Sequence, residues 1–214
     1  MKITAIITAA GNSVRFGGNK LLEKIDGKFV IQKTLDVFID HPKIDEIIVT
    51  YNKNSETAFK NLNLKNKPVK FVLGGETRTQ SVKNALKTIK NCDIVLIHDG
   101  ARPYITEKII SDCIQCVIEN KSAICAVPVT DTIAEVRSGE ITKTIERNLL
   151  YKIQTPQGFY FKGILNAYES LTDNENYTDD SQVYQKTFKK SHIFLGSMEN
   201  IKITYKSDIT KGVK

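Results

Sequence analysis

The sequence predicts an α/β fold with a mostly parallel sheet and helices on both faces, and three observations lead to this prediction. Apolar, β-branched runs of strand length alternate with segments of helical period up to about residue 130. The 214 residues are 41% hydrophobic and 26% charged, a composition that can bury a core. Because no Pro-, Gly- or Ser-rich linker and no internal repeat divides the chain, we expect one domain over residues 1–214.

Strands and helices are expected to alternate in the first part of the chain. Each apolar strand is followed by an amphipathic segment, which is the pattern of β-α-β units. The expected strands are Ile3–Ala9, Glu46–Tyr51, Val69–Leu73, Ile94–His98 and Ala123–Val127. The expected helices are Val30–Ile39, Glu56–Leu64, Gln80–Ile89 and Glu107–Glu119.

The alternation breaks after residue 130, where the sequence predicts a β-hairpin. Thr132–Val136 and Ile141–Ile145 have strand patterns, and residues 137–140 form a polar turn that contains glycine. Because a short hairpin cannot join a parallel sheet by a crossover, we expect residues 131–150 to project as an arm. Two helices and two strands are expected to follow, at Lys162–Leu171, Asp180–Lys186, His192–Leu195 and Asn200–Tyr205.

Charge and composition restrict the classes of function. The chain has 31 Lys and Arg against 24 Asp and Glu, and the resulting +7 is scattered, which favours small anions over nucleic acid. No run approaches the ~20 apolar residues of a membrane span, and the start resembles a buried strand more than a signal peptide. Cys113 and Cys116 form a C-x-x-C within a helical pattern, without a second pair at zinc spacing. We therefore expect buried thiols and a reducing cytoplasm.

Small and charged residues gather where the expected parallel strands end, which is where an open α/β sheet binds its ligands. The loop after the first strand begins with Ala-Ala-Gly at 9–11 and carries two cations, Arg15 and Lys20, before its first acidic residue. This loop is neither the dinucleotide fingerprint nor a P-loop. Its backbone N–H groups and cations suit a triphosphate, and an ordinary tight turn is the alternative.

One carboxylate, Asp99, ends the fourth expected strand beside Arg102. Next to a polyphosphate loop it suits Mg²⁺, which takes one or two carboxylates together with phosphate oxygens and water. A salt bridge or cap is the alternative role for a single aspartate. His98 is expected to be a packed, hydrogen-bonded residue, and the other two histidines have no neighbours that suggest a metal site or a catalytic triad.

Eight short motifs follow one another along the chain. They are A-A-G-x-x-x-R-F-G (9–17), G-G-E-x-R-x-x-S-V (74–82), H-D-G-A-R-P (98–103), V-P-V-T-D-T-I (127–133), T-I-E-R (144–147), Q-T-P-Q-G-F (154–159), T-D-D (178–180) and N-I-K-I-T (200–204). With this set the chain resembles the 2-C-methyl-D-erythritol 4-phosphate cytidylyltransferase family of the non-mevalonate isoprenoid pathway. Each motif alone is weak, but eight in order are specific and cover essentially the whole length.

The resemblance implies a Rossmann-like nucleotidyltransferase fold and a reaction that transfers the cytidylyl group of CTP to 2-C-methyl-D-erythritol 4-phosphate, with release of pyrophosphate. It further implies that Asp99 holds Mg²⁺ or another divalent cation, and that homodimers form through the hairpin arm. The catalytic residues implied are Arg15, Lys20, Arg147 and Lys202. The nucleotide-binding residues implied are Ala9, Ala10, Gly11, Gly75, Glu76, Arg78, Ser81 and Ala101, and the substrate-binding residues are Arg102, Thr155 and Thr178.

The sequence departs from the family pattern in two places. The family usually has Pro-Lys-Gln at its lysine, whereas this chain has Asn-Lys-Leu at 19–21 and a shorter gap after Arg15. Lys20 is the lysine that this loop offers, so the resemblance still assigns the role to it. Few residues follow Asp208, so the helix that commonly closes the fold is expected to be largely missing.

Three other functions are alternatives to this one. Ribitol-5-phosphate cytidylyltransferase shares the fold and the chemistry, but its loop tends to read D-S-V-R-P where this chain has D-G-A-R-P at 99–103. A nucleic-acid-binding protein would account for the positive charge, but no aromatic residues are interleaved with segregated basic ones. A dinucleotide-dependent oxidoreductase needs G-x-G-x-x-G and an acidic residue after the second strand, where this chain has Tyr-Asn-Lys at 51–53.

Overall fold

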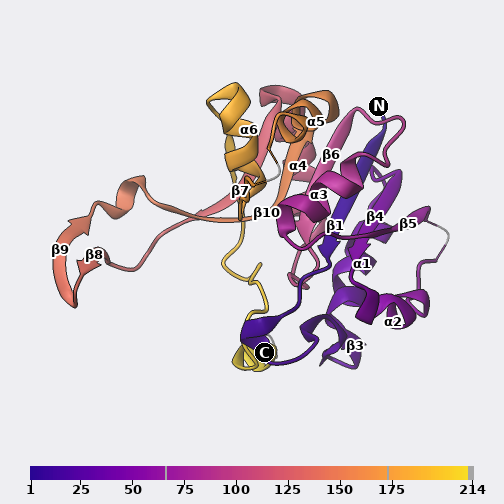
Figure 1. Ribbon diagram of the computed structural model, residues 1–214, viewed down its shortest axis with the longest axis horizontal. Coiled ribbons are helices and arrows are strands. Elements are labelled where there is room, and N and C mark those ends of the chain that lie inside the picture. Colours follow the sequence, from indigo (N-terminus) through magenta and orange to yellow (C-terminus); the bar gives the residue numbers. More distant parts are fainter. Residues whose placement is uncertain (66, 173, 212–214) are drawn as a thin grey trace.

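The computed structural model describes residues 1–65, 67–172 and 174–211, and a seven-stranded sheet lies at its centre (Figure 1). In spatial order the strands are β11 (Ile193–Leu195), β7 (Ser122–Pro128), β10 (Tyr151–Tyr160), β6 (Ile94–Asp99), β1 (Ile3–Ala9), β4 (Glu46–Tyr51) and β5 (Val69–Leu73). Within this sheet, β10 runs antiparallel to both of its neighbours and every other pairing is parallel. The predicted fold class is confirmed.

Both faces of the sheet are buried, which explains why β1, β4, β6 and β7 are largely apolar. On β1, Ala5 and Ile7 belong to one core cluster and Ile6 to the other, because successive side chains point to opposite faces. The first cluster is covered by α1 (Val30–Asp40) and α4 (Glu107–Asn120). The second is covered by α3 (Arg78–Leu86), α5 (Phe161–Glu169) and α6 (Asp180–Phe188).

Two of the predicted helices differ from the structure by three or more residues at one end. The helix α3 starts earlier than predicted because the Thr77 side chain caps it, accepting a hydrogen bond from the backbone N–H of Gln80 at 3.1 Å. The helix α2 (Glu56–Lys60) is shorter than predicted, because Asn61 closes it with a bond from its backbone N–H to the Ala58 carbonyl. In the described part of the chain, no helix has the length and apolar character that crossing a membrane requires.

Several short elements complete the chain. A short helix, α7 (Ser207–Lys211), lies where the closing helix was expected to be largely missing. The other short elements are β2 (Lys24–Ile25) and β3 (Lys28–Phe29), and the 3₁₀ turns η1 (Val14–Phe16), η2 (Lys20–Leu22), η3 (Lys53–Ser55) and η4 (Arg147–Leu149).

The central strand β10 was not predicted. Its sequence carries a proline and buried polar residues instead of an apolar run, and the register with β7 shifts between Ile153 and Gln157 around Pro156. Gly158 allows α4 to pack directly on this strand, since a Cβ there would lie 2.6 Å from Val117 Cγ2. A strand of this kind is defined by its neighbours, so its local sequence pattern did not indicate it.

The predicted strand Asn200–Tyr205 is wrong, because these residues pair with no strand in the described part of the chain. They form an extended segment that is hydrogen-bonded to Ala101 and Arg102, just after the carboxyl end of β6. The backbone N–H of Ile203 donates to the Ala101 carbonyl at 2.8 Å, and the Ile203 side chain is fully buried in the core. The apolar alternation at Ile201 and Ile203 therefore reflects anchoring to the core and not a strand ladder.

The predicted hairpin arm is present and extends away from the sheet (Figure 1). Its strands are β8 (Ile133–Arg137) and β9 (Glu140–Ile145). Ser138 and Gly139 both have positive φ, 51° and 87°, as the tight turn of a two-residue hairpin requires. Apolar side chains on and beside the hairpin are exposed, among them Val136, Ile141 and Leu149.

The four cysteines are free thiols. Cys113 and Cys125 are buried as expected, whereas Cys92 and Cys116 are half-buried. Burial raises the pKa of each of these thiols, so they are protonated and behave as packing residues.

Candidate active site

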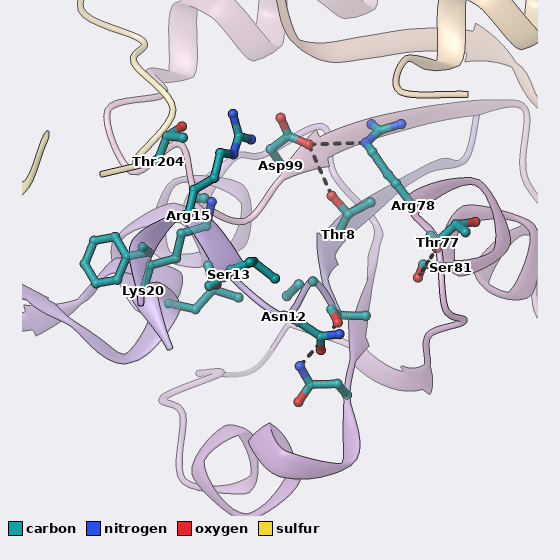
Figure 2. Close-up of a pocket in the computed structure, with 18 of the residues that line it drawn as sticks. Thr8, Asn12, Ser13, Arg15, Lys20, Thr77, Arg78, Ser81, Asp99 and Thr204 are labelled. Atoms are coloured by element: carbon teal, nitrogen blue, oxygen red, sulfur yellow. Dashed lines mark hydrogen bonds and ion pairs between the residues drawn. The ribbon is translucent and has the colours of Figure 1, made fainter. Parts of the chain in front are cut away.

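A cavity of about 350 Å³ opens at the carboxyl ends of the parallel strands (Figure 2). It is bordered by the loop after β1, the loop after β5, the end of β6 and the extended segment at 200–205. Most of the residues expected in the site line this cavity: Ala9, Ala10, Gly11, Arg15, Lys20, Gly75, Glu76, Arg78, Ser81, Asp99, Ala101 and Lys202. Arg102, Thr155, Thr178 and Arg147 do not belong to its lining.

The loop after β1 offers backbone donors to the cavity. It turns at Ser13, which has a left-handed φ of 52°, and the buried ring of Phe16 anchors it to the core. Among the described residues, no acceptor lies against the backbone N–H groups of Gly11, Asn12 and Ser13. Unpaired N–H groups in such a turn form an anion-binding loop, which suits a phosphate.

The loop after β5 forms another wall of the cavity and depends on its two glycines. A Cβ on Gly74 would lie 2.3 Å from the Cβ of Ala10, so only glycine lets the two loops approach this closely. The backbone N–H of Gly75 donates to Ser81 Oγ at 3.1 Å, and the Ser81 hydroxyl donates to the Thr77 carbonyl at 2.9 Å. The Ser81 hydroxyl therefore shapes this loop from within.

Arg15, Lys20 and Lys202 are cations that line the cavity, and Figure 2 draws Arg15 and Lys20 side by side. Lys20 Nζ donates to the Ile203 carbonyl at 2.7 Å, and Lys202 Nζ lies 2.8 Å from Asp99 Oδ2. Burial, followed by repulsion from Lys202, lowers the pKa of Lys20 to about 8, and Arg15 acts in the same direction. The cavity therefore concentrates positive charge, as a site for a polyphosphate requires.

Asp99 lies on the floor of the cavity and is ionised. Burial alone would raise the pKa of its carboxyl group, but Lys202, Arg78 and Arg102 together hold this pKa well below its ordinary value. The guanidinium Nε of Arg78 lies 3.4 Å from Oδ1, and that of Arg102 lies 3.4 Å from Oδ2. The Thr8 hydroxyl also donates to Oδ1 at 3.4 Å.

Arg102 and Thr155 lie beneath Asp99 and not in the wall of the cavity. The hydroxyl oxygen of Thr155 accepts the backbone N–H of Asp99 at 3.1 Å, and it lies 3.0 Å from His98 Nδ1. The other ring nitrogen, Nε2, faces the Arg102 carbonyl at 3.4 Å, so Nε2 carries the proton and Nδ1 accepts from Thr155. Burial lowers the pKa of His98 to about 3, so the ring is neutral, and the expectation of a packed, hydrogen-bonded histidine is confirmed.

Arg102 also holds the extended segment that brings Lys202 to Asp99. Its Nη1 donates to the Asn200 carbonyl at 2.7 Å, and the Asn200 amide donates to the Thr155 carbonyl at 2.9 Å. The end of β6, the start of β10 and the C-terminal segment thus meet in one hydrogen-bond network behind the cavity.

Two expected site residues, Arg147 and Thr178, do not line the cavity, and they lie in different parts of the fold. Arg147 belongs to η4 in the arm, where its Nη1 donates to the Thr130 carbonyl at 2.9 Å, and the arm extends away from the sheet (Figure 1). Thr178 is exposed in the segment that precedes α6. One copy of the chain therefore does not bring Arg147 to the other site residues.

Several residues of the site were missed at the level of sequence, and Asn52 and Asp180 are two of them. Asn52 lines the cavity, and its side-chain amide donates to the Ala10 carbonyl at 3.2 Å. Its position directly after β4 was a signal, because the carboxyl ends of all the parallel strands meet here. Asp180 is fully buried and pairs with Arg78, although from its motif only Thr178 was taken as a site residue.

The residues of the cavity fit a magnesium ion that is held largely by substrate. In the described part of the chain, no group of three or more His, Cys, Asp or Glu side chains could enclose a metal by itself. Asp99 supplies an ionised carboxylate to the lining of a cationic cavity. One carboxylate together with phosphate oxygens and water is a usual coordination for Mg²⁺.

Comparison with known proteins agrees with this geometry. The model of the family described as IspD, 2-C-methyl-D-erythritol 4-phosphate cytidylyltransferase, matches residues 3–212. The protein of that name from Clostridioides difficile is 43% identical over 215 residues, covering 96% of this chain and 90% of its own length. The one from Bacillus mycoides is 38% identical over 212 residues, covering 96% and 94%.

Solved structures of the same family share the fold. The 4-diphosphocytidyl-2C-methyl-D-erythritol synthase of Anaerococcus prevotii superposes with a TM-score of 0.88 at 33% identity, covering 99% of this chain and 94% of that one. The 2-C-methyl-D-erythritol 4-phosphate cytidylyltransferase of Francisella tularensis superposes with a TM-score of 0.83 at 31% identity, covering 99% and 98%. The chain therefore belongs to the IspD family of 2-C-methyl-D-erythritol 4-phosphate cytidylyltransferases.

Proposed function

We propose that the cavity binds CTP and transfers its cytidylyl group to 2-C-methyl-D-erythritol 4-phosphate, giving 4-diphosphocytidyl-2-C-methyl-D-erythritol and pyrophosphate. One observation carries this proposal: Arg15, Lys20 and Lys202 gather around the ionised Asp99 in a cavity whose first wall is a loop of small residues with unpaired N–H groups. Such a site is suited to a triphosphate and to a second phosphate beside it.

In the proposed reaction, an oxygen of the acceptor phosphate attacks the α-phosphorus of CTP in line. A new P–O bond forms, the bond from the α-phosphorus to the oxygen that bridges to the β-phosphate breaks, and pyrophosphate leaves with that oxygen. The acceptor phosphate is already largely a dianion near neutral pH, so the reaction needs no strong general base. The chain has to supply orientation and neutralisation of charge.

We propose that Lys20 and Arg15 stabilise the charge that develops on the phosphates of CTP. Lys20 is suited to this because burial and its cationic neighbours lower its pKa to about 8, and a bound polyphosphate would restore the charged form. Ala9, Ala10, Gly11, Gly75, Glu76, Arg78, Ser81 and Ala101 are proposed to contact the nucleotide. The lining of the cavity by all of these residues supports this assignment.

We propose that Asp99 holds Mg²⁺ or another divalent cation together with phosphate oxygens of CTP. When bound, this cation would neutralise phosphate charge and polarise the α-phosphoryl group. Lys202 now pairs with Asp99, so the ammonium group of Lys202 would become available to the acceptor phosphate once Asp99 faces a metal ion. Arg102 and Thr155 are proposed to serve acceptor binding by holding Asp99 and the Lys202 segment in place.

We also propose that the hairpin arm pairs two copies of the chain and that the second copy supplies Arg147. The exposed apolar side chains of Val136, Ile141 and Leu149 support the pairing, because such a group of side chains is typical of a protein interface. The position of Arg147 on the arm, outside the cavity of its own chain, supports its contribution to the neighbouring site. Thr178, which is exposed, is proposed to contact the acceptor in the assembled site.

We place the reaction in the cytoplasm. The four unpaired thiols support this assignment, because cytoplasmic proteins keep their cysteines reduced.

The experiment that tests the function measures pyrophosphate release from CTP with two acceptors in parallel. We expect release with 2-C-methyl-D-erythritol 4-phosphate in the presence of Mg²⁺, and little or none with ribitol 5-phosphate. Release with ribitol 5-phosphate alone would overturn the assignment and favour the ribitol-5-phosphate reaction.

A further inference from the structure

A buried ion pair stands directly behind one wall of the cavity. Arg78 Nη1 donates to Asp180 Oδ1 at 2.8 Å, and Arg78 Nη2 donates to Asp180 Oδ2 at 2.6 Å. The Tyr168 hydroxyl donates to Asp180 Oδ1 at 2.6 Å. Asp180 is 0% exposed and Tyr168 is 1% exposed, so water does not compete for these bonds.

The same guanidinium faces the cavity on its other side. Its Nε lies 3.4 Å from Asp99 Oδ1, and Figure 2 marks this contact with a dashed line. Arg78 is the first residue of α3, Tyr168 lies in α5 and Asp180 is the first residue of α6. The helices α3, α5 and α6 cover the same face of the sheet, and they therefore meet at the side chain of Arg78.

The arrangement fixes how the arginine is presented. A free arginine side chain has several rotatable bonds, but a planar guanidinium that is bound at both Nη atoms has one orientation. Asp180 is suited to this task because its carboxylate is itself immobilised by the Tyr168 hydroxyl and by burial. Only the Nε edge of the guanidinium then remains to face Asp99.

We propose that Asp180 and Tyr168 are positioning residues that hold Arg78 in its nucleotide-binding orientation. This proposal rests on the proposed function, since it takes Arg78 to contact CTP. Asp180 and Tyr168 act through Arg78 and touch neither substrate. Loss of either one frees the guanidinium to turn, so CTP binds less tightly even though no nucleotide contact has been deleted.

The proposal is tested by calorimetric titration of CTP into purified protein, which needs no acceptor and is run with and without Mg²⁺. Tyr168→Phe keeps the buried ring and removes one hydrogen bond to a charged group, so we expect a CTP Kd about 3- to 20-fold higher. Asp180→Asn removes the charge that pairs with Arg78, so we expect it to raise the CTP Kd by more than Tyr168→Phe does. Thermal unfolding of each variant shows whether the protein is folded at the temperature of the titration.

Tyr184→Phe is the matched control. Tyr184 belongs to the same core cluster as Tyr168 and stacks on Phe188 with ring centroids 4.4 Å apart, but no hydrogen bond of its hydroxyl is present in the described part of the chain. Tyr184→Phe should therefore leave the CTP Kd within about twofold of the unmodified protein.

A double-mutant cycle shows whether the effect passes through Arg78. Lysine at this position cannot form the bidentate pair, so Arg78→Lys should weaken CTP binding by itself, and Tyr168→Phe added to it should change the Kd by less than about twofold. An equal loss from Tyr168→Phe in both backgrounds would overturn the proposal, as would normal CTP binding by both Tyr168→Phe and Asp180→Asn. Normal CTP binding by Arg78→Lys would also overturn the proposal, because it would show that the arginine is not needed to bind the nucleotide. Failure of the proposed function would show itself separately, as absence of pyrophosphate release by the unmodified protein.

Discussion

The ammonium group of Lys20 donates to the backbone carbonyl of Ile203 at 2.7 Å, across 183 positions of sequence. The Ile203 carbonyl is held in place because the same residue's N–H binds the Ala101 carbonyl and its side chain is buried. Lys20 is thus positioned in the lining of the cavity by a segment from the far end of the chain. Figure 1 shows this segment beside the early part of the chain.

CTP binding is expected to take up a proton above about pH 8. Lys20 has a pKa of about 8 in the free protein, so roughly half of it is neutral at that pH, and a triphosphate favours the charged form. Affinity for CTP should therefore decrease as the pH rises through 8. Calorimetry in buffers of different ionisation enthalpy measures the uptake.

Lys20→Met should abolish this proton uptake, whereas Lys108→Met, which alters an exposed lysine on α4, should leave it unchanged. Equal uptake in all three proteins would show that another group titrates.

Asp99→Asn is expected to raise the Mg²⁺ concentration needed for half-maximal pyrophosphate release. The amide removes the charge that we propose binds the metal, and it leaves Lys202, Arg78 and Arg102 without their shared carboxylate. A titration of activity with Mg²⁺ at saturating CTP measures the shift. Asp112→Asn, on the outer surface of α4, is the control, and an identical Mg²⁺ curve for Asp99→Asn would assign Asp99 a structural role alone.

Lys20→Ala and Arg147→Ala should each lower kcat by about 10²–10³, since each removes a donor proposed to act on transition-state charge. If the arm crosses to a second copy, mixing the two variants under exchange conditions creates heterodimers in which one site has both unmodified residues. Activity should then return toward half of the normal value in those heterodimers.

Subunit exchange is followed with two labels so that mixing is verified independently of activity. If each site is built within one chain, every site in the mixture carries a defect. Verified exchange without recovery of activity would therefore contradict the shared site.

Gly158→Ala is expected to lower the free energy of unfolding by about 1–3 kcal/mol. The added Cβ would lie 2.6 Å from Val117 Cγ2 and 2.8 Å from Cys113 Sγ, so α4 would have to move away from β10. Urea unfolding followed by circular dichroism measures the change.

Gly163→Ala is the matched control for this substitution, because its Cβ would meet nothing nearer than 3.5 Å and it lies in the helix α5. It should be neutral or stabilise the protein by about 0.5–1 kcal/mol. Equal stability of the two variants would show that α4 can move away from β10 at a lower cost in free energy than these distances indicate.

The order of strands and helices up to residue 130, the hairpin and most of the cavity lining followed from the sequence by itself. These features depend on local patterns. Apolar periodicity distinguishes a buried strand from an amphipathic helix, and parallel strands bring their carboxyl ends to one edge wherever each lies in the sheet. Arg15, Lys20 and Asp99 could therefore be placed together before any contact was known.

Only the tertiary structure decided the features that depend on distant partners. The strand β10 has a proline and buried polar residues that no local rule assigns to the middle of a sheet, and its surroundings satisfy them. Arg78 and Asp180 lie 102 positions apart, and their pairing follows from the meeting of α3 and α6 on one face of the sheet. Periodicity reports which side of an element is buried, but a polar contact depends on the distance and direction of atoms that only the folded chain brings together.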